Sequence, residues 1–379
     1  MLYESFDLGN GLQVSWVDEI LPSQQKFNEA SLERLGFVDT ESTHTMSQSP
    51  VLSTVDFDAE GVQHGYLKVP YSGDDSGWGA VMIPLTVVKN DVGPTVIFTG
   101  ANHGDEYEGP IALWWLSNEL KSKDIRGRVI IVPAMNYPAF KAGKRTSSID
   151  GGNMNRAFPG RPDGTITEII ADYFNRVLLP MADYVADLHS GGKTLDFVPF
   201  ACAHVLEDKH QQARCVAAME AFNAPYSLML LELDSAKMYD TAAEKMGKVF
   251  IGTELGGGGS ASATTVGIAK RGIANLLKHA GILSGEPERG PSISLVTPDH
   301  RSFVTSEHSG LLEMCVDLGS DVKNGEVIAL VHDIERTGTQ PVEYKATIDG
   351  VLAGRHYPSL TQPGDNLAVI AIRVEENQD

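Results

Sequence analysis

Between residues 93 and 280 the sequence alternates short apolar runs with longer amphipathic segments, and this alternation constrains the fold more than any other feature. The short runs, which are typical of buried strands, are residues 95–99, 128–133, 184–188 and 248–253. The longer segments, with apolar residues at three- and four-residue spacing, are residues 110–121, 168–179, 211–223 and 261–280. Because strands that alternate with helices form a mostly parallel or mixed sheet covered on both faces, the sequence predicts an α/β fold.

The two ends of the chain differ from this middle part. Residues 1–45 are mixed and polar, and Met46 opens a segment that resembles an ordinary start, so we expect residues 1–45 to be a dispensable extension. Residues 285–291 are rich in glycine and proline and break the alternation as a linker does. Short strands separated by glycine turns follow. The predicted organisation is an extension (1–45), an α/β domain (46–288) and a C-terminal all-β domain (289–379).

A histidine and a glutamate lie three positions apart just after the first apolar run. His103 and Glu106 offer a nitrogen and a hard oxygen ligand on a strand-to-helix turn, where open α/β sheets bind ligands. A catalytic zinc ion takes three protein ligands, for example two histidines and a glutamate. His189, which follows the run at 184–188 and opens a glycine-rich turn, is the expected third ligand. A single histidine is more often a hydrogen-bonded core or surface residue, but the paired motif favours a metal.

Glu254 follows the run at 248–253 and precedes Leu255 and four glycines. Hydrolysis at a metal needs a group that takes a proton from water and returns it to the leaving nitrogen. A glycine loop leaves space for a substrate beside this carboxylate. We therefore predict that Glu254 is the proton shuttle; the alternative is a surface glutamate before a flexible loop.

Two arginines stand in a glycine-dense loop at residues 143–160. Arg145 and Arg156, with Asn155 between them, are suited to carboxylate recognition and to stabilising a developing oxyanion. In a chain with a formal charge of −20, such arginines indicate an anionic substrate. The alternative is that they only hold acidic loops such as the one that contains Asp150.

Composition restricts the partners and the compartment. A net charge of −20 argues against nucleic acid and anionic membranes, which need a basic face. Cys202, Cys215 and Cys315 are odd in number and widely spaced, which indicates a reducing compartment without a disulfide framework. No run of eighteen apolar residues occurs, so we expect a soluble cytoplasmic protein. The expected partner is a small molecule, and self-association stays open.

Four motifs in this order together resemble one enzyme family. They are His-Gly-Asp-Glu from residue 103, Asn-Arg-Ala-Phe-Pro-Gly from residue 155, Asp-Leu-His-Ser-Gly from residue 187 and Thr-Glu-Leu-Gly from residue 253. They look like the succinylglutamate desuccinylase and aspartoacylase family, which is similar in fold to zinc carboxypeptidases. The resemblance covers about residues 90–375 and includes a trailing β-domain.

The resemblance implies a role for each matching residue. One zinc ion per subunit would bind to His103, Glu106 and His189. Glu254 would act as the general base and then as the general acid. Arg145 would polarise the scissile carbonyl. Asn155 and Arg156 would bind the substrate carboxylate; many relatives carry an aspartate where this chain has Asn153, so a local acidic contact is missing here.

Longer segments around residues 143–156 and 190–200 look most like the deacetylases of N-alpha-acetyl-L-2,4-diaminobutyrate in ectoine degradation. The resemblance implies that the enzyme removes an acetyl group from the amino nitrogen of a small amino acid. Such an enzyme must also accommodate a side-chain ammonium, for which Glu232 and Asp234 offer one contact. A solvated loop is the alternative interpretation of these two residues.

Three other functions stay open at this stage. A deacylase of another N-acyl amino acid, of the succinylglutamate or N-acetylaspartate type, would share the same motifs. A metallocarboxypeptidase would use the same ligands, although the appended β-domain could cap the cleft and restrict entry to small molecules. A non-catalytic carrier is suggested by the C-terminal domain, which resembles lipoyl and biotinyl domains. Carrier domains need an exposed lysine at a hairpin tip, and residues 332–338 contain none.

Overall fold

The computed structural model describes residues 3–7, 13–17, 48–74, 76–230 and 236–374. The described residues divide into two units, one that lies before residue 48 and one that begins there. In the first unit, β1 (Tyr3–Asp7) pairs with β2 (Gln13–Val17) in antiparallel orientation. The other residues of the predicted extension lie outside the described part of the chain, and its dispensability stays a prediction.

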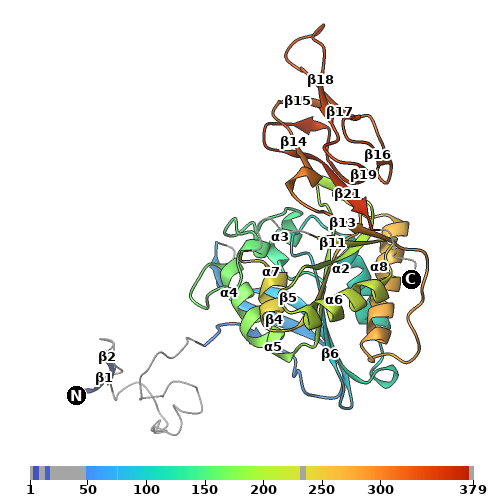
Figure 1. Ribbon diagram of the computed structural model, residues 1–379. Helices are drawn as coiled ribbons and strands as arrows, with labels where there is room; N and C mark the ends of the chain where they lie inside the picture. The colour runs from blue at the N-terminus through green and yellow to red at the C-terminus, as the bar shows by residue number, and fades with distance from the viewer. Residues whose placement is uncertain (1–2, 8–12, 18–47, 75, 231–235, 375–379) are drawn as a thin grey trace. The chain divides into compact units, whose positions relative to one another are not determined.

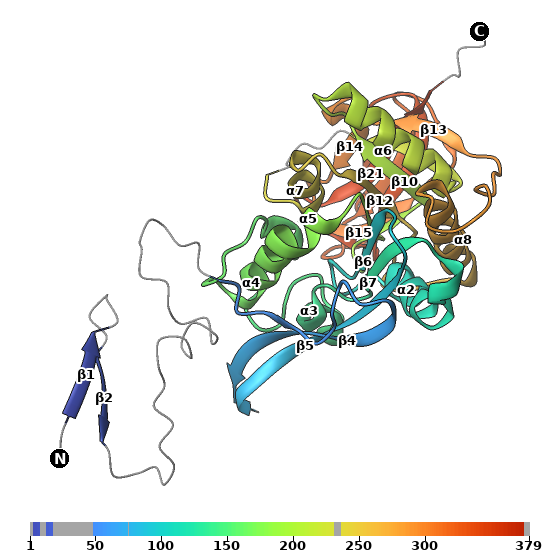
Figure 2. The same ribbon diagram turned by 90° about the horizontal axis from the view of Figure 1, so that it is seen from below.

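The second unit is built on a large mixed sheet, as Figures 1 and 2 show. In chain order its strands are β3 (Leu52–Ser53), β4 (Gly61–Gly73), β5 (Ser76–Asn90), β6 (Thr95–Gly100), β7 (Gly127–Val132), β8 (Tyr184–His189), β9 (Leu195–Phe197), β10 (Phe200–His204), β11 (Tyr226–Leu230), β12 (Val249–Glu254), β13 (Ile293–Val296), β14 (Phe303–Thr305), β16 (Asp321–Val322), β19 (Gly350–His356) and β21 (Asn366–Arg373). The four predicted apolar runs form β6, β7, β8 and β12, which are mutually parallel neighbours.

Helices cover both faces of this sheet (Figure 2). They are α2 (Glu108–Glu119), α3 (Tyr137–Ala142), α4 (Ile166–Tyr173), α5 (Leu179–Met181), α6 (Lys209–Phe222), α7 (Tyr239–Lys245) and α8 (Ala263–His279), with the short turns η1 (Ser122–Asp124), η2 (Met154–Arg156), η3 (Phe174–Leu178) and η4 (His300–Ser302). The prediction of an α/β fold with a mixed, helix-covered sheet is therefore confirmed.

The predicted helix at residues 168–179 is observed as α4, the π-helical turn η3 and α5 in succession. It begins earlier than predicted because Thr165 caps α4. The Thr165 side chain accepts a hydrogen bond from the Glu168 backbone, and the Glu168 carboxylate accepts one from the Thr165 backbone.

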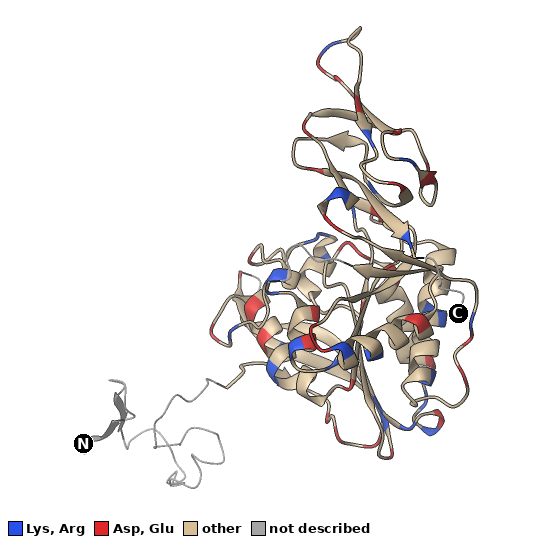
Figure 3. Cartoon of the chain, viewed as in Figure 1, with Lys and Arg blue, Asp and Glu red and all other residues tan. Residues whose placement is uncertain are grey.

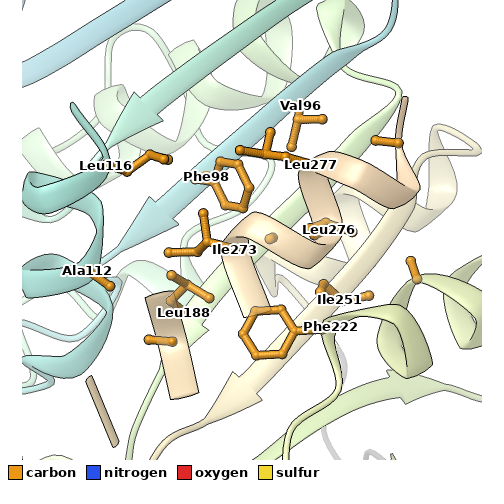
Figure 4. Packing of buried hydrophobic residues seen from close by; sticks show 14 of the residues in the cluster. Val96, Phe98, Ala112, Leu116, Leu188, Phe222, Ile251, Ile273, Leu276 and Leu277 are labelled. Carbon is orange, nitrogen blue, oxygen red and sulfur yellow. The ribbon is translucent and has the colours of Figure 1, made fainter. Parts of the chain in front are cut away.

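Two apolar layers form the core, one on each face of the sheet. Because successive strand residues point to opposite faces, Val96 and Phe98 of β6 pack against α2, α6 and α8, whereas Ile97 faces the layer under α4 and α7. Figure 4 shows Phe98 beside Leu277 and Leu188 beside Ile273, between the sheet and the helices. Charged residues of both signs are interspersed on the helices and loops in Figure 3.

The C-terminal strands continue the same sheet. β13 lies parallel to β11, and β21 lies antiparallel to β13, so the order runs on through β19 to β16 (Figure 1). A second, four-stranded sheet contains β15 (Gly310–Met314), β17 (Val327–His332), β18 (Val342–Lys345) and β20 (Leu360–Thr361). The predicted boundary at residues 288 and 289 falls between α8 and β13, and the division into domains stays a prediction.

Candidate metal centre and active site

The carboxyl ends of three adjacent parallel strands bring the candidate residues together. β6 pairs with β8 with Gly100 opposite Leu188, and β12 pairs with β8 with Glu254 opposite His189. The turn after β6 carries His103 and Glu106, β8 ends at His189, and β12 ends at Glu254. This is the edge at which α/β sheets bind ligands.

His103, Glu106 and His189 converge on one point. His103 Nδ1 lies 2.7 Å from Glu106 Oε1, and His189 Nδ1 lies 2.9 Å from Glu106 Oε2. The three potential ligand atoms lie within 4.8 Å of one another. The backbone N–H of Ser190 also donates to Glu106 Oε2, at 3.2 Å, and fixes that carboxylate.

Asp187 orients His189 from the far side of the ring. His189 Nε2 lies 2.7 Å from Asp187 Oδ2, and Asp187 in turn accepts hydrogen bonds from Thr99 Oγ1 at 2.7 Å and Asn102 Nδ2 at 2.8 Å. No role for Asp187 is predicted from the sequence. The signal was present, because Asp187 and His189 are two positions apart on one strand and therefore point to the same face.

The pKa shifts in this cluster follow from burial and from the balance of charge. Burial lowers the pKa of His103, against the raising effect of Glu106. Burial also acts to raise the pKa of Glu106, but the two histidines outweigh it and hold the carboxylate ionised. For His189, burial acts to lower the pKa, yet Asp187 and Glu106 raise it well above its ordinary value.

These residues fit a divalent cation such as zinc. Two imidazole nitrogens and a carboxylate form the His₂Glu set of catalytic zinc sites, and the Asp187 contact is the outer carboxylate that zinc-binding histidines usually have. Asp187 and Glu106 favour the protonated, positively charged form of His189. A cation bound among His103, Glu106 and His189 would supply that positive charge instead.

Glu254 lies beside this cluster, opposite His189 on the paired strand. Its Oε2 atom is buried and has no hydrogen-bond partner within the described residues. Burial raises the pKa of Glu254 to about 8, and the negative charge of Glu106 adds to the increase. A carboxyl group with a pKa near neutrality is suited to both accepting and donating a proton.

The glycine loop after Glu254 passes close to the short strand β9. A Cβ atom on Gly257 would lie 2.0 Å from the carbonyl oxygen of Leu195, so only glycine fits at this position. Gly258 donates its backbone N–H to the same carbonyl at 3.0 Å. The loop therefore holds β9 against the site, and both Leu195 and Phe197 line the pocket there.

Arg145 and Asn155 reach the pocket from the loop at residues 143–160. Arg145 Nη1 lies 3.7 Å from Glu106 Oε1, and its side chain is about half exposed, at 46%. Asn155 Oδ1 accepts from the Tyr239 backbone N–H at 3.0 Å and from Asn102 Nδ2 at 3.4 Å. With its oxygen so engaged, the Asn155 amide is left to donate through Nδ2.

Arg156 also lines the pocket, and its Nη1 donates to the Asn155 carbonyl at 2.6 Å. Asp150 binds none of these arginines. It accepts from the Thr167 backbone at 2.7 Å, from Thr167 Oγ1 at 2.8 Å and from the Gly152 backbone at 3.0 Å. Asp150 thus anchors the loop to the start of α4. Asn153, which departs from the family pattern, accepts from the Asn155 backbone at 3.0 Å.

All seven residues predicted for the site line or adjoin one pocket of about 180 Å³. This volume is below the roughly 300–1,000 Å³ of drug-sized sites, so the pocket suits a small molecule. Sequence reasoning missed His204 and Asp240, which also line it. Glu232 and Asp234, the predicted ammonium contacts, lie outside the described residues.

The C-terminal strands support one wall of this pocket. β19 pairs with β9, with Arg355 opposite Asp196 and His356 opposite Leu195. Arg355 also donates to Asp196 Oδ2 from Nε at 3.2 Å and from Nη2 at 2.8 Å. The wall formed by Leu195 and Phe197 is therefore held on its outer side by the C-terminal part of the chain.

Comparison with known proteins places the chain among deacylases. A family model described as the succinylglutamate desuccinylase/aspartoacylase catalytic domain matches residues 92–280. A relative from Halomonas elongata, N-alpha-acetyl-L-2,4-diaminobutyric acid deacetylase, is 57% identical over 330 residues, which cover 86% of this chain and 96% of the relative.

Solved structures agree with this comparison. The product-bound structure of the ectoine utilization protein EutE (DoeB) from Ruegeria pomeroyi is 60% identical with a TM-score of 0.85, covering 86% of this chain and 99% of that one. A succinylglutamate desuccinylase/aspartoacylase from Rhodobacter sphaeroides is 38% identical with a TM-score of 0.82, covering 86% of this chain and 100% of that one.

Proposed function

The chain belongs to the succinylglutamate desuccinylase/aspartoacylase family, and we propose that it is a zinc-dependent amidohydrolase acting on N-alpha-acetyl-L-2,4-diaminobutyrate. The products are L-2,4-diaminobutyrate and acetate, and the reaction belongs to ectoine catabolism. The names of the relatives from Halomonas elongata and Ruegeria pomeroyi support this substrate. The observation that carries the proposal is the convergence of His103, Glu106 and His189 beside Glu254 in one small pocket.

His103 and His189, through Nδ1, and Glu106, through its carboxylate, are the residues that would hold one zinc ion. When bound, zinc supplies a Lewis acid that lowers the pKa of water and polarises a carbonyl. Asp187 keeps the His189 ring turned so that Nδ1 faces Glu106.

Glu254 moves the proton in this proposal. Its carboxylate takes a proton from the water that attacks the acetyl carbonyl, and it then gives that proton to the amide nitrogen as the C–N bond breaks. The unpartnered, buried Oε2 and the pKa near neutrality support both transfers.

The arginine loop binds and stabilises the substrate. Arg145 carries its positive charge beside Glu106, where it can stabilise the oxyanion that develops on the acetyl carbonyl. Asn155 donates through Nδ2, and Arg156 offers its guanidinium, to the α-carboxylate of the substrate. Together they fix the end of the substrate that does not react.

The pocket size favours an acyl amino acid over a peptide. A volume of about 180 Å³, closed on one side by Leu195 and Phe197, leaves little space for a residue beyond the scissile bond. The C-terminal strands support that wall through β19, so the proposal assigns them the role of restricting entry.

We also propose a cytoplasmic location and a small-molecule partner. All three cysteines lie in the described part of the chain and none forms a disulfide, which supports a reducing compartment. Within the described residues no helix is long and apolar enough to span a membrane.

The decisive experiment pairs metal analysis with a substrate screen. Purified protein is assayed for acetate release from N-alpha-acetyl-L-2,4-diaminobutyrate, for release from other N-acyl amino acids, and for cleavage of a dipeptide panel. Glu254→Ala is expected to retain the metal and lose activity. Cleavage of peptides alone would overturn the deacetylase, and unchanged activity in the variant would remove Glu254 from the mechanism.

A further inference from the structure

A buried carboxylate that has no part in the proposed reaction also lines the pocket. Asp240 lies in the first turn of α7 and is only 7% exposed. Its Oδ1 atom accepts hydrogen bonds from the backbone and the hydroxyl of Thr241.

Asp240 is an acidic group in the lining of this pocket. The other lining side chains include the apolar Met238, Phe250 and Leu230 as well as the donors Arg156 and His204. A carboxylate oxygen gains a charge-assisted hydrogen bond when a cationic donor meets it. A ligand that brings a cationic donor into the pocket would provide that partner.

Asp240 is tied by its backbone to the residue that receives the substrate carboxylate. The N–H of Tyr239, one position before Asp240, donates to Asn155 Oδ1 at 3.0 Å. One turn of chain therefore orients the Asn155 amide and presents the Asp240 carboxylate. A short amino acid whose α-carboxylate lies at Asn155 extends its side chain within the same small pocket.

We propose that Asp240 forms a subsite for a primary ammonium group and binds the side-chain amine of the substrate. The inference rests on the proposed function for the identity of that substrate, because L-2,4-diaminobutyrate carries such an amine two methylenes from its α-carbon. Asp240 thereby selects a cationic side chain over an apolar side chain of the same shape. The Asp240 carboxylate takes the place that Glu232 and Asp234 have in the sequence-based prediction.

The test compares two amino acids that differ at one group. L-norvaline has a methyl group where L-2,4-diaminobutyrate has the ammonium, and both have the same α-substituents. Binding of each to the full-length, metal-loaded protein is measured by titration calorimetry for the wild type and for Asp240→Asn. The asparagine keeps an acceptor for Thr241 and removes the charge.

Wild type is expected to prefer L-2,4-diaminobutyrate over L-norvaline by roughly 10- to 100-fold, the scale of one charge-assisted hydrogen bond. Asp240→Asn is expected to lose most of that preference. Asp208→Asn is the matched control, because Asp208 caps α6 by accepting from His210 and Gln211 and does not line the pocket. The control is expected to keep the preference of the wild type.

Two results would overturn the subsite. One is a preference that survives in Asp240→Asn or is absent from the wild type. The other is an equal loss of affinity for both amino acids, which shows a structural role. Acetate release is measured separately on the same preparations. If the protein releases no acetate but shows a binding preference that depends on Asp240, the proposed reaction is rejected and the subsite is retained.

Discussion

His189 Nε2 lies 2.7 Å from Asp187 Oδ2, and the opposite ring nitrogen, Nδ1, faces Glu106 at 2.9 Å. One histidine is thus held between two carboxylates, one of which sits behind it on the same strand. The outer contact fixes which ring nitrogen faces the candidate metal centre, and it raises the basicity of that nitrogen.

We therefore expect Asp187→Asn to lower zinc affinity by roughly 10- to 100-fold. The substitution removes the charge behind His189 and keeps the side-chain shape. Competition with a chelator of known affinity measures the effect. Asp183→Asn is the matched control, since Asp183 accepts from the Thr95 backbone at the opposite end of β8. Equal metal affinity in wild type and Asp187→Asn would contradict the role given to Asp187.

Arg145 and Arg156 are expected to affect different kinetic constants. Arg145→Ala should lower kcat by on the order of 10²- to 10³-fold with a smaller change in KM, because the oxyanion charge exists mainly in the transition state. Arg156→Ala should mainly raise KM, because the carboxylate is bound equally before and during reaction. Steady-state kinetics on N-alpha-acetyl-L-2,4-diaminobutyrate separates the two. The same kcat and KM changes in both variants would reject this division of roles.

Arg355 is expected to act on catalysis through β9. Its guanidinium donates twice to Asp196, which lies between Leu195 and Phe197 of the pocket wall. Arg355→Ala should raise KM several-fold, because the wall loses its outer support. Since both partners are partly exposed, the free energy of unfolding should fall by only about 1 kcal/mol or less.

Arg301→Ala provides the comparison for Arg355. Arg301 binds Asp299 with a similar two-point contact in the C-terminal part of the chain, and neither residue lines the pocket. Arg301→Ala should lower the free energy of unfolding by no more than Arg355→Ala does, and it should leave KM unchanged. A KM change of the same size in both variants would show a general effect of the C-terminal strands.

Asp150 should stabilise the protein in a pH-dependent way. Burial acts to raise its pKa, but the hydrogen bonds from Thr167, Ser147 and Gly152 lower it below the ordinary value of 3.8. A lowered pKa means that the folded state favours the ionised form, so the stabilisation is complete above pH 3.8. It is lost as the pH falls through the lowered pKa of the folded protein.

Denaturant unfolding of Asp150→Asn tests this expectation. At pH 7 the variant should be less stable than wild type by about 1 kcal/mol, the usual net contribution of such hydrogen bonds. The difference should shrink below pH 3.8. Asp163→Asn, at an exposed position of the neighbouring turn, should show little change at either pH. A stability difference that grows as the pH falls would refute the assignment.

The strands and helices that the sequence predicted well are those with strong internal patterns. β6, β7, β8 and β12 are continuous apolar runs, and their positions follow from that pattern alone. The strands β10 and β11, at Phe200–His204 and Tyr226–Leu230, were not predicted. Their short, mixed sequences become strands through pairing with each other and with β12 and β13.

The residues of the candidate site also divide into those that the sequence predicts and those that it does not. His103, Glu106, His189 and Glu254 could be predicted because each directly follows an apolar run, and parallel strands end at one edge of a sheet. Asp240 could not be predicted, since its only local signal is an acidic residue near a short helix.

The sequence by itself determined the α/β fold, the family and which residue types are candidates for metal binding, because these depend on periodicity and on motifs of adjacent residues. Only the tertiary structure decided that Asp187 stands behind His189, that Arg355 supports the pocket wall through β9, and that Asp240 faces the pocket. These are contacts between side chains set by strand pairing and packing, and sequence spacing alone does not encode the distances between them. The candidate metal ligands His103 and Glu106 lie between these two cases: their spacing is local, but the candidate third ligand, His189, lies on the neighbouring strand.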